Sequence, residues 1–444
     1  MNREKKSKAL SERAIRMIFG DELKNQAKMN EKDFTRKRKV GFVSLVCMLM
    51  RMVRKTTQLE LDEFRKMFLP DSETTTYTKQ SFSEARQKLS PVAFTLLNDE
   101  IVRGFYEDGD FKMYKGFRLL AMDGSVIEVP QTKETLQTYG YATNQEGRKV
   151  ARALSSHLFD VENKIAISTC MSRYDDHERN LAKKNIEKLL ELVPSHIPNL
   201  ILFDRGYPSA DLIRYLEEKN ICYLMRVSSA FYKEVLETSS PDEVVRIEIN
   251  RERAKALKKK GTPLKRGTVI EVRVLKVELP SGEMEVLLTN LTREELRYEE
   301  SSALYFKRWG IETRINELKQ TFEIENFSAE KPLLIEQDFY ATVFLSNMAS
   351  IYEQEAEEEL REKNKNKVRK HTEYRINKSM LVGKLRNDLI EIILNEDDKE
   401  KEQLYHRLME ELQRNVVPVI PNRNFKREKQ SKANRFTQTK RRNL

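Results

Sequence analysis

The most informative segment of the sequence is Tyr305-Phe-Lys-Arg-Trp-Gly-Ile-Glu-Thr-Arg-Ile-Asn-Glu-Leu-Lys-Gln320. Wound as one α-helix, with about 100° of rotation per residue, it gathers four polar side chains into a stripe about 60° wide. These are Tyr305, Arg308, Glu312 and Lys319. Apolar residues beside the stripe predict a core-facing seam. The other edge presents a carboxylate, two cations and a phenol, which suits phosphate and metal. An amphipathic helix with an ordinary Arg308–Glu312 pair is the alternative.

The composition indicates a soluble globular protein with more than one core. The 444 residues are 39% hydrophobic and 34% charged, with room for roughly two to four modules. The longest apolar run, 40–50, is too short to span a bilayer, and the first residues lack the apolar segment of a signal peptide. The three cysteines, Cys47, Cys170 and Cys222, lack metal-ligand spacing. We expect a cytoplasmic protein with no membrane partner.

The net charge of +11 is concentrated at the two ends of the chain. Residues 1–60 carry 16 Lys and Arg against 7 Asp and Glu, and residues 421–444 carry 9 against 1, so the middle is acidic. Basic ends around an acidic body predict a polyanionic partner that the ends hold. Tails that only keep the protein in solution are the alternative.

The first part of the chain predicts a basic arm, 1–30, followed by an all-helical module, 31–110. The helices are expected at 40–50, 59–68, 79–88 and 91–106, with a turn at 70–72. Arg86 and Lys88 are expected to be exposed near a turn. Such a module can place a helix in a DNA groove, although a simple helical scaffold has the same pattern.

From Phe117 the pattern changes to short strands. Strands are expected at 117–122, 152–159, 164–170, 200–203 and 221–227, with a hairpin turn at 160–163 and helices up to Leu192 and Lys219. The order β-β-β-α-β-α-β predicts a layered α/β sheet with functional residues at strand ends. Residues 111–229 would form the first part of this core, and 301–355 the second.

Two further regions complete the expected organisation. Residues 230–300 predict a β-rich insertion with strands at 244–249, 269–279 and 284–291, a turn at 280–282, and a basic face, since 251–276 holds 10 basic residues against 2 acidic ones. The C-terminal helical region, 356–444, follows an apolar helix at 339–352. It contains a basic stretch at 361–378, a short helix at 404–412 and a polar tail from 421.

Three carboxylates occupy special positions. Asp123 ends the first strand, Asp204 ends the fourth, and Glu312 lies on the helix after the insertion. If those two strands are neighbours, the aspartates meet at one edge of the sheet and the helix can bring Glu312 to them. Such a trio can hold two Mg²⁺ or Mn²⁺ ions about 3.5–4 Å apart, because these hard cations prefer oxygen ligands. Taken singly, Asp123 can be a turn residue and Asp204 a helix cap.

These motifs resemble the bacterial insertion-sequence DDE transposases of the insertion-sequence-four type. The resemblance is carried by Asp123 in Ala-Met-Asp-Gly-Ser, by Asp204 in Phe-Asp-Arg-Gly-Tyr-Pro-Ser, and by the spaced Tyr-(2)-Arg-(3)-Glu-(6)-Lys signature of the opening stretch. It covers roughly residues 30–350. The 108-residue gap between Asp204 and Glu312 fits the β-strand insertion of that family.

The resemblance implies a ribonuclease-H-like (retroviral-integrase-like) core that hydrolyses DNA at the terminal inverted repeats of a mobile element. The freed 3′-hydroxyl ends would then attack target DNA in a cut-and-paste reaction. By resemblance, the metal ligands are Asp123, Asp204 and Glu312, and the phosphate contacts are Tyr305, Arg308 and Lys319. A flipped nucleotide would rest on Trp309 or Tyr305, although Trp309 equally suits a core anchor. Arg205 would contact phosphate or pair with a neighbouring acid.

The implied partners are double-stranded DNA, as element end and as target, and a second copy of the chain. Residues 339–352 or 404–412 could supply the dimer surface, and the protein would work on the bacterial nucleoid. Three alternatives remain: a covalent recombinase using Tyr305, a structure-selective metal-dependent nuclease, and a catalytically silent transposase-derived DNA-binding protein. The first would need Arg and His around Tyr305, and the five histidines form no such set.

Overall fold

The computed structural model describes residues 5–36, 39–51, 55–68, 77–259, 261, 264–279, 282–365 and 373–420. The predicted turn at 70–72, most of the turn at 280–282 and the polar tail from 421 lie outside these ranges. Within them, no helix has both the length and the apolar character that a membrane crossing requires.

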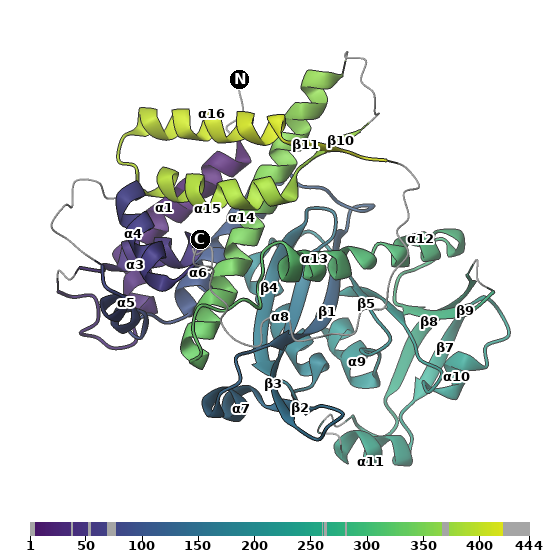
Figure 1. The fold of residues 1–444 in the computed structure, drawn as a ribbon. Helices are drawn as coiled ribbons and strands as arrows, with labels where there is room; N and C mark the ends of the chain where they lie inside the picture. Colours follow the sequence, from purple (N-terminus) through teal and green to yellow (C-terminus); the bar gives the residue numbers. More distant parts are fainter. Residues whose placement is uncertain are drawn as a thin grey trace.

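A nine-stranded mixed sheet forms the centre of the molecule, in the order β2-β3-β1-β5-β6-β9-β8-β7, with β4 paired to β3 (Figure 1). Its strands are β1 Arg118–Glu128, β2 Tyr141–Thr143, β3 Lys149–Asp160, β4 Ile165–Arg173, β5 Asn199–Phe203, β6 Cys222–Arg226, β7 Asp242–Glu248, β8 Val269–Glu278 and β9 Met284–Thr289. The five predicted core strands are all present, and the short strand β2 was missed.

The strand directions confirm the predicted ribonuclease-H-like fold. β1 is antiparallel to β3, β3 is antiparallel to β4, and β1, β5 and β6 run parallel to one another. Helices α8 (Glu178–Leu192) and α9 (Ala210–Glu218) connect the parallel strands. β5 is the fourth predicted strand, so the expectation that the first and fourth strands are neighbours is confirmed.

β1 is longer than the sequence predicted, because β3 pairs with it beyond residue 122. The ladder continues from Asp123 opposite His157 to Glu128 opposite Arg152. Asp123 therefore lies inside β1, and it is β5 that ends beside it. The prediction that Asp123 ends its strand is wrong, since pairing with β3 continues where pairing with β5 stops.

The strands of 230–300 continue the central sheet. β9 pairs antiparallel with β6, and β8 and β7 follow outward, so all three predicted strands of this region are present. Two short helices, α10 Lys233–Leu236 and α11 Arg251–Lys259, accompany them. Part of the basic face is used internally, because buried Arg273 pairs with Asp242 at 2.8 Å.

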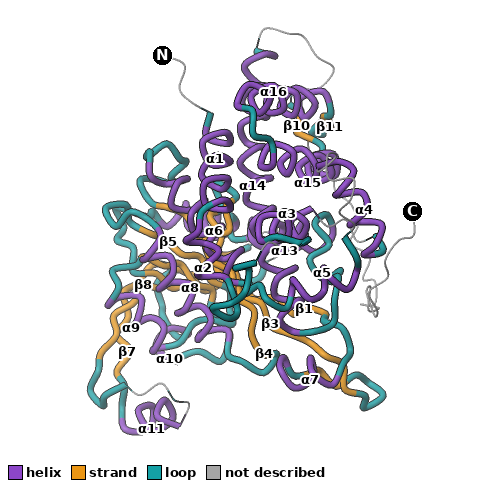
Figure 2. The backbone as a smooth tube through the Cα atoms, turned by 90° about the vertical axis from the view of Figure 1, so that its left-hand side faces the viewer, coloured by secondary structure: helices purple, strands orange, loops and turns teal. Residues whose placement is uncertain are grey.

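Helices from both ends of the chain gather on one side of the sheet (Figures 1 and 2). The first set is α1 Lys6–Phe19, α2 Asp21–Ala27, α3 Phe42–Arg51, α4 Thr57–Phe68, α5 Lys79–Arg86 and α6 Val92–Glu107. The second set is α14 Pro332–Asn364, α15 Lys378–Leu394 and α16 Asp398–Arg414, with the small β10 Tyr374–Ile376 and β11 Val416–Pro418 pair. A further helix, α7 Lys133–Tyr139, precedes β2.

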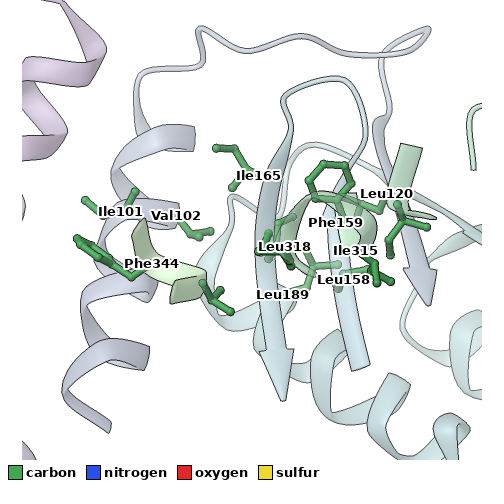
Figure 3. Packing of buried hydrophobic residues seen from close by; sticks show 14 of the residues in the cluster. Ile101, Val102, Leu120, Leu158, Phe159, Ile165, Leu189, Ile315, Leu318 and Phe344 are labelled. Atoms are coloured by element: carbon green, nitrogen blue, oxygen red, sulfur yellow. The ribbon is translucent and has the colours of Figure 1, made fainter. Parts of the chain in front are cut away.

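Helix α14 joins the helical module to the sheet. It packs against α1, α3 and α6 along one side and against β4 along the other. Figure 3 shows the result, with Ile101 and Val102 of α6 and Phe344 of α14 beside Ile165 of β4. The described residues thus share one hydrophobic core.

Both segments predicted as dimer surfaces face the interior of the chain. Phe339, Phe344 and Tyr352 of α14 have no exposed surface, and Leu408 and Leu412 of α16 are buried too. These apolar residues are therefore not available as a dimer surface, because they pack within one chain.

Arg86 is also buried, contrary to the prediction. Its guanidinium lies 3.0 Å from Asp338 and donates to Gln337 and Ser328. This network fastens α5 to α14. Lys88 is partly exposed.

Candidate active site

The opening stretch forms two helices rather than one. α12 spans Ser301–Phe306 and α13 spans Trp309–Gln320, and a turn at 307–308 separates them. Here the backbone N–H groups of Arg308 and Ile311 donate to carbonyls three residues back, at 3.0 and 3.1 Å, which winds the chain more tightly than an α-helix. A Cβ at Gly310 would stand 2.9 Å from Val161, so only glycine admits this close approach. The prediction of one continuous helix is wrong at this turn.

Asp123 and Asp204 are brought together by strand register. The last parallel pair of β1 and β5 is Met122 opposite Phe203, and each aspartate is the next residue. One oxygen of each carboxylate accepts a backbone N–H, from Gly124 at 2.9 Å and from Gly206 at 2.8 Å. In the described part of the chain, neither aspartate forms an ion pair. Two carboxylates therefore meet at one edge of the sheet without a basic side chain paired to either.

Electrostatics place the opening stretch at the same edge. Burial, together with the negative charge of Asp204, raises the pKa of Asp123 to about 7. The charge of Glu312 adds to this rise, and the charge of Arg308 opposes it. Because such effects fall off with distance, α13 has delivered Glu312 to the neighbourhood of the aspartates.

Arg308 is buried, with 7% of its surface exposed, and contacts three other residues of this stretch. Its Nη2 donates to Glu312 at 2.7 Å, and its guanidinium lies 5.7 Å from the Tyr305 ring and 5.5 Å from the Trp309 ring. Its Nε is buried and has no hydrogen-bond partner. Tyr305 is buried as well, and burial raises the pKa of its phenol to about 12. Arg308 thus keeps a spare donor beside the acids.

Lys319 fixes α13 to the sheet. Its Nζ donates to the carbonyl of Val126 at 2.6 Å and lies 3.1 Å from Glu325, which accepts from the backbone of Glu128 at 3.0 Å. The positive end of the stripe is therefore anchored to β1, the strand that carries Asp123.

The outer surface of the turn is aromatic and basic. Trp309 is 40% exposed, so the core-anchor alternative does not describe it. Phe306 is 70% exposed, the largest fraction of any large hydrophobic side chain that the structure describes, and sequence reasoning missed it. The run Phe306-Lys-Arg-Trp309 carried the signal, because aromatic and basic residues alternate at surfaces that bind single-stranded nucleic acid. Arg205 is exposed beside Asp204.

A fourth carboxylate, also missed, lies against the aspartates. Glu178 is the first residue of α8, and its Oε1 lies 2.6 Å from where a Cβ on Gly124 would stand. Burial and the charge of Asp204 raise the pKa of Glu178. The acidic run before α8 was the only sequence signal, and nothing in it points to Asp204.

The acids do not yet form a closed cage. Throughout the described ranges, no group of three or more His, Cys, Asp or Glu side chains is placed to hold a metal ion. Glu312 pairs with Arg308 instead, with its Oε1 2.7 Å from the Arg308 Nη2.

Comparison with known proteins adds a family match. A family model described as "Transposase DDE domain" matches residues 114–348, which include all three predicted catalytic acids. None of the curated proteins matches the chain. Among solved structures, the chain is similar to a piggyBac transposase synaptic complex with hairpin DNA, seen by cryo-electron microscopy. That match has 11% sequence identity and a TM-score of 0.46, and it covers 93% of this chain and 87% of the other.

Proposed function

Because the chain belongs to the family of transposase DDE domains, we propose that it is a cut-and-paste DNA transposase of the insertion-sequence-four type. It hydrolyses phosphodiester bonds at the ends of a mobile element and joins the freed 3′-hydroxyl ends to target DNA. The observation that carries the proposal is the β1–β5 register, which sets Asp123 beside Asp204. The charges of Glu312 and Arg308 act at the same place.

The residues fit a hard divalent cation. Asp123 and Asp204 offer oxygens at one edge, and their mutual repulsion is what a cation relieves. Bound Mg²⁺ or Mn²⁺ would activate the attacking oxygen and stabilise the leaving oxygen. Asp123 must lose its proton first. Glu312 would join the aspartates by exchanging its contact with Arg308, whose second role is then to hold the DNA phosphate.

The DNA strand would lie along the turn between α12 and α13. Arg308 and the exposed Arg205 would contact phosphate groups of this strand. Tyr305 and Lys319 would contact phosphate groups of the same strand. Phe306 and Trp309 would stack on a nucleotide flipped out beside the cut.

A basic groove in the helical module supports a separate grip on DNA. The groove has a volume of about 670 Å³ and lies between the loop before α3 and helix α5. Four cations line it, and in the described ranges none of them forms an ion pair: Lys32, Arg36, Lys39 and Lys88. We assign recognition of the terminal repeats to this module. Two copies of the chain would hold the two ends on the bacterial nucleoid.

Purified protein incubated with DNA carrying candidate element ends, with Mg²⁺ or with EDTA, tests the function. We expect metal-dependent cutting and joining, both abolished by Glu312→Gln with end binding retained. Glu187→Gln, on the exposed side of α8, is the control that should keep both activities. Cutting of branched DNA without joining would indicate a structure-selective nuclease, and binding without cutting a silent DNA-binding protein. Retained cutting in Glu312→Gln would overturn the site.

A further inference from the structure

Two glycines make room for Glu178 beside the aspartates. A Cβ on Gly124 would meet the Glu178 side chain at 2.6, 2.9 and 3.3 Å, and real Cβ atoms essentially never come within 3.0 Å. A Cβ on Gly206 would stand 3.1 Å from Asp204 Oδ1 and 3.9 Å from Glu178 Oε2. Both carboxylates therefore lie around one point.

Space, rather than backbone conformation, explains the glycine at 124. Its φ lies outside the positive range that favours glycine, so any residue could adopt its backbone. The three heavy atoms nearest to a Cβ there all belong to the Glu178 side chain, which would have to move to admit it. The Asp-Gly step of the first motif thus serves to admit an acid from α8.

In the described part of the chain, Glu178 has no bonded partner, although the positive charge of the neighbouring Arg179 opposes the rise of its pKa. It accepts no hydrogen bond and forms no ion pair there, whereas Glu187 of the same helix bonds Tyr215 and Lys219. The N-terminus of α8 offsets some of its negative charge. The nearby charge of Asp204 opposes it.

A buried tyrosine hydroxyl without a hydrogen-bond partner is a second, independent observation at this place. Tyr207 has no exposed surface, and its Oη has no hydrogen-bond partner in the structure. Burial raises the pKa of this phenol most, followed by the charges of Glu178, Asp123, Asp204 and Cys170, in that order. A buried donor beside three carboxylates would normally bond one of them. It does so only if the carboxylates shift.

We propose that Glu178 is a fourth acidic ligand of the divalent cation, closing on it from the side of Asp204 while Tyr207 donates to one of the carboxylates. The proposal rests on the proposed function. Glu178 needs only a side-chain rotation that breaks no bond, whereas Glu312 must first leave Arg308. Glu178 would therefore help to hold the cation before Glu312 arrives.

Calorimetric titration of the full chain with Mn²⁺, without DNA, tests the proposal. Glu178→Gln should weaken Mn²⁺ binding by about tenfold or more, and the matched control Glu187→Gln should not. Without metal, Glu178→Gln should keep or raise the melting temperature, since it removes a repelled charge, and it should gain less from Mn²⁺ than the wild type. A merely structural glutamate would instead lose stability without metal.

The outcomes separate this inference from the proposed function. Wild-type protein that binds no Mn²⁺ would overturn both. Wild-type binding that Glu178→Gln matches in affinity would overturn the role of Glu178 alone. If Glu178→Gln does not fold, Glu178→Asp keeps the charge but shortens its reach, and unchanged affinity in that variant would also count against the proposal.

Discussion

Arg86 and Asp338 form a buried ion pair, 3.0 Å apart, at the junction between the helical module and α14. Arg86 also donates to Gln337, to Ser328 and to the carbonyl of Leu334. The arginine that the sequence predicted to be exposed therefore connects two parts of the fold. It couples the proposed DNA-reading module to the helix behind the sheet.

Arg86→Ala should lower the free energy of unfolding by about 3–5 kcal/mol, because it removes the cation that neutralises the buried charge of Asp338. Urea denaturation followed by circular dichroism measures the change. Arg103→Ala is the control, since its ion pair with Glu191 is exposed and should contribute at most about 1 kcal/mol. Equal losses in the two variants would contradict this role of Arg86.

Metal-free protein should lose stability as pH rises toward 7. Asp123 has its pKa raised from 3.8 to about 7, so the folded state holds a proton there that the unfolded state has released. Stability falls with pH wherever the folded state binds more protons. Asp123→Asn lacks this titrating group. In EDTA, its melting temperature should therefore rise above that of the wild type by a margin that grows between about pH 4 and pH 7. An advantage independent of pH would contradict this.

Phe306→Ala and Trp309→Ala should each weaken the hold on a flipped nucleotide by about 1–3 kcal/mol, the usual contribution of one base stacked on one aromatic ring. Fluorescence of 2-aminopurine placed beside the cut reports the loss of stacking. Phe19→Ala removes a comparably exposed aromatic of α1 and should leave the signal unchanged. Unaltered fluorescence in both variants would contradict the proposal that the DNA contacts the turn between α12 and α13.

Replacing the lysines that line the groove with glutamine should reduce the salt dependence of binding to DNA that carries element ends. Lys32→Gln, Lys39→Gln and Lys88→Gln should each lower the slope of log affinity against log salt by about 0.9, if each side chain neutralises one phosphate. Lys399→Gln, an exposed lysine of α16, is the control. Slopes that match the control would place the DNA elsewhere.

The core strands and the aspartate pair could be predicted because their signals are local. Apolar runs between turn residues identify strands, and the order of strands and helices permits only a few sheets. The neighbouring positions of Asp123 and Asp204 follow from that order and the parallel register.

Glu178, the burial of Arg86 and the extension of β1 could not be predicted, because each depends on contacts between distant segments. Glu178 meets Gly124 across the sheet edge, and Arg86 meets Asp338 across 252 residues of chain. The break at 307–308 is accompanied by a close approach of Gly310 to Val161, which helical periodicity does not encode. Candidate residues that belong to a local sequence motif were predicted. Glu178, whose position depends on segments distant in the sequence, was missed.

Helix α14 runs unbroken for 33 residues, or about 50 Å, and is held by α6 and β4 along its length. We expect so long a packed helix to limit how far the helical module can move relative to the sheet that carries the acids. The protein would then fix the distance along the DNA between the recognised bases and the cleaved bond, independently of the sequence between them. Under the proposed function, a change in α14 or in the Arg86–Asp338 contact is then expected to move the cut.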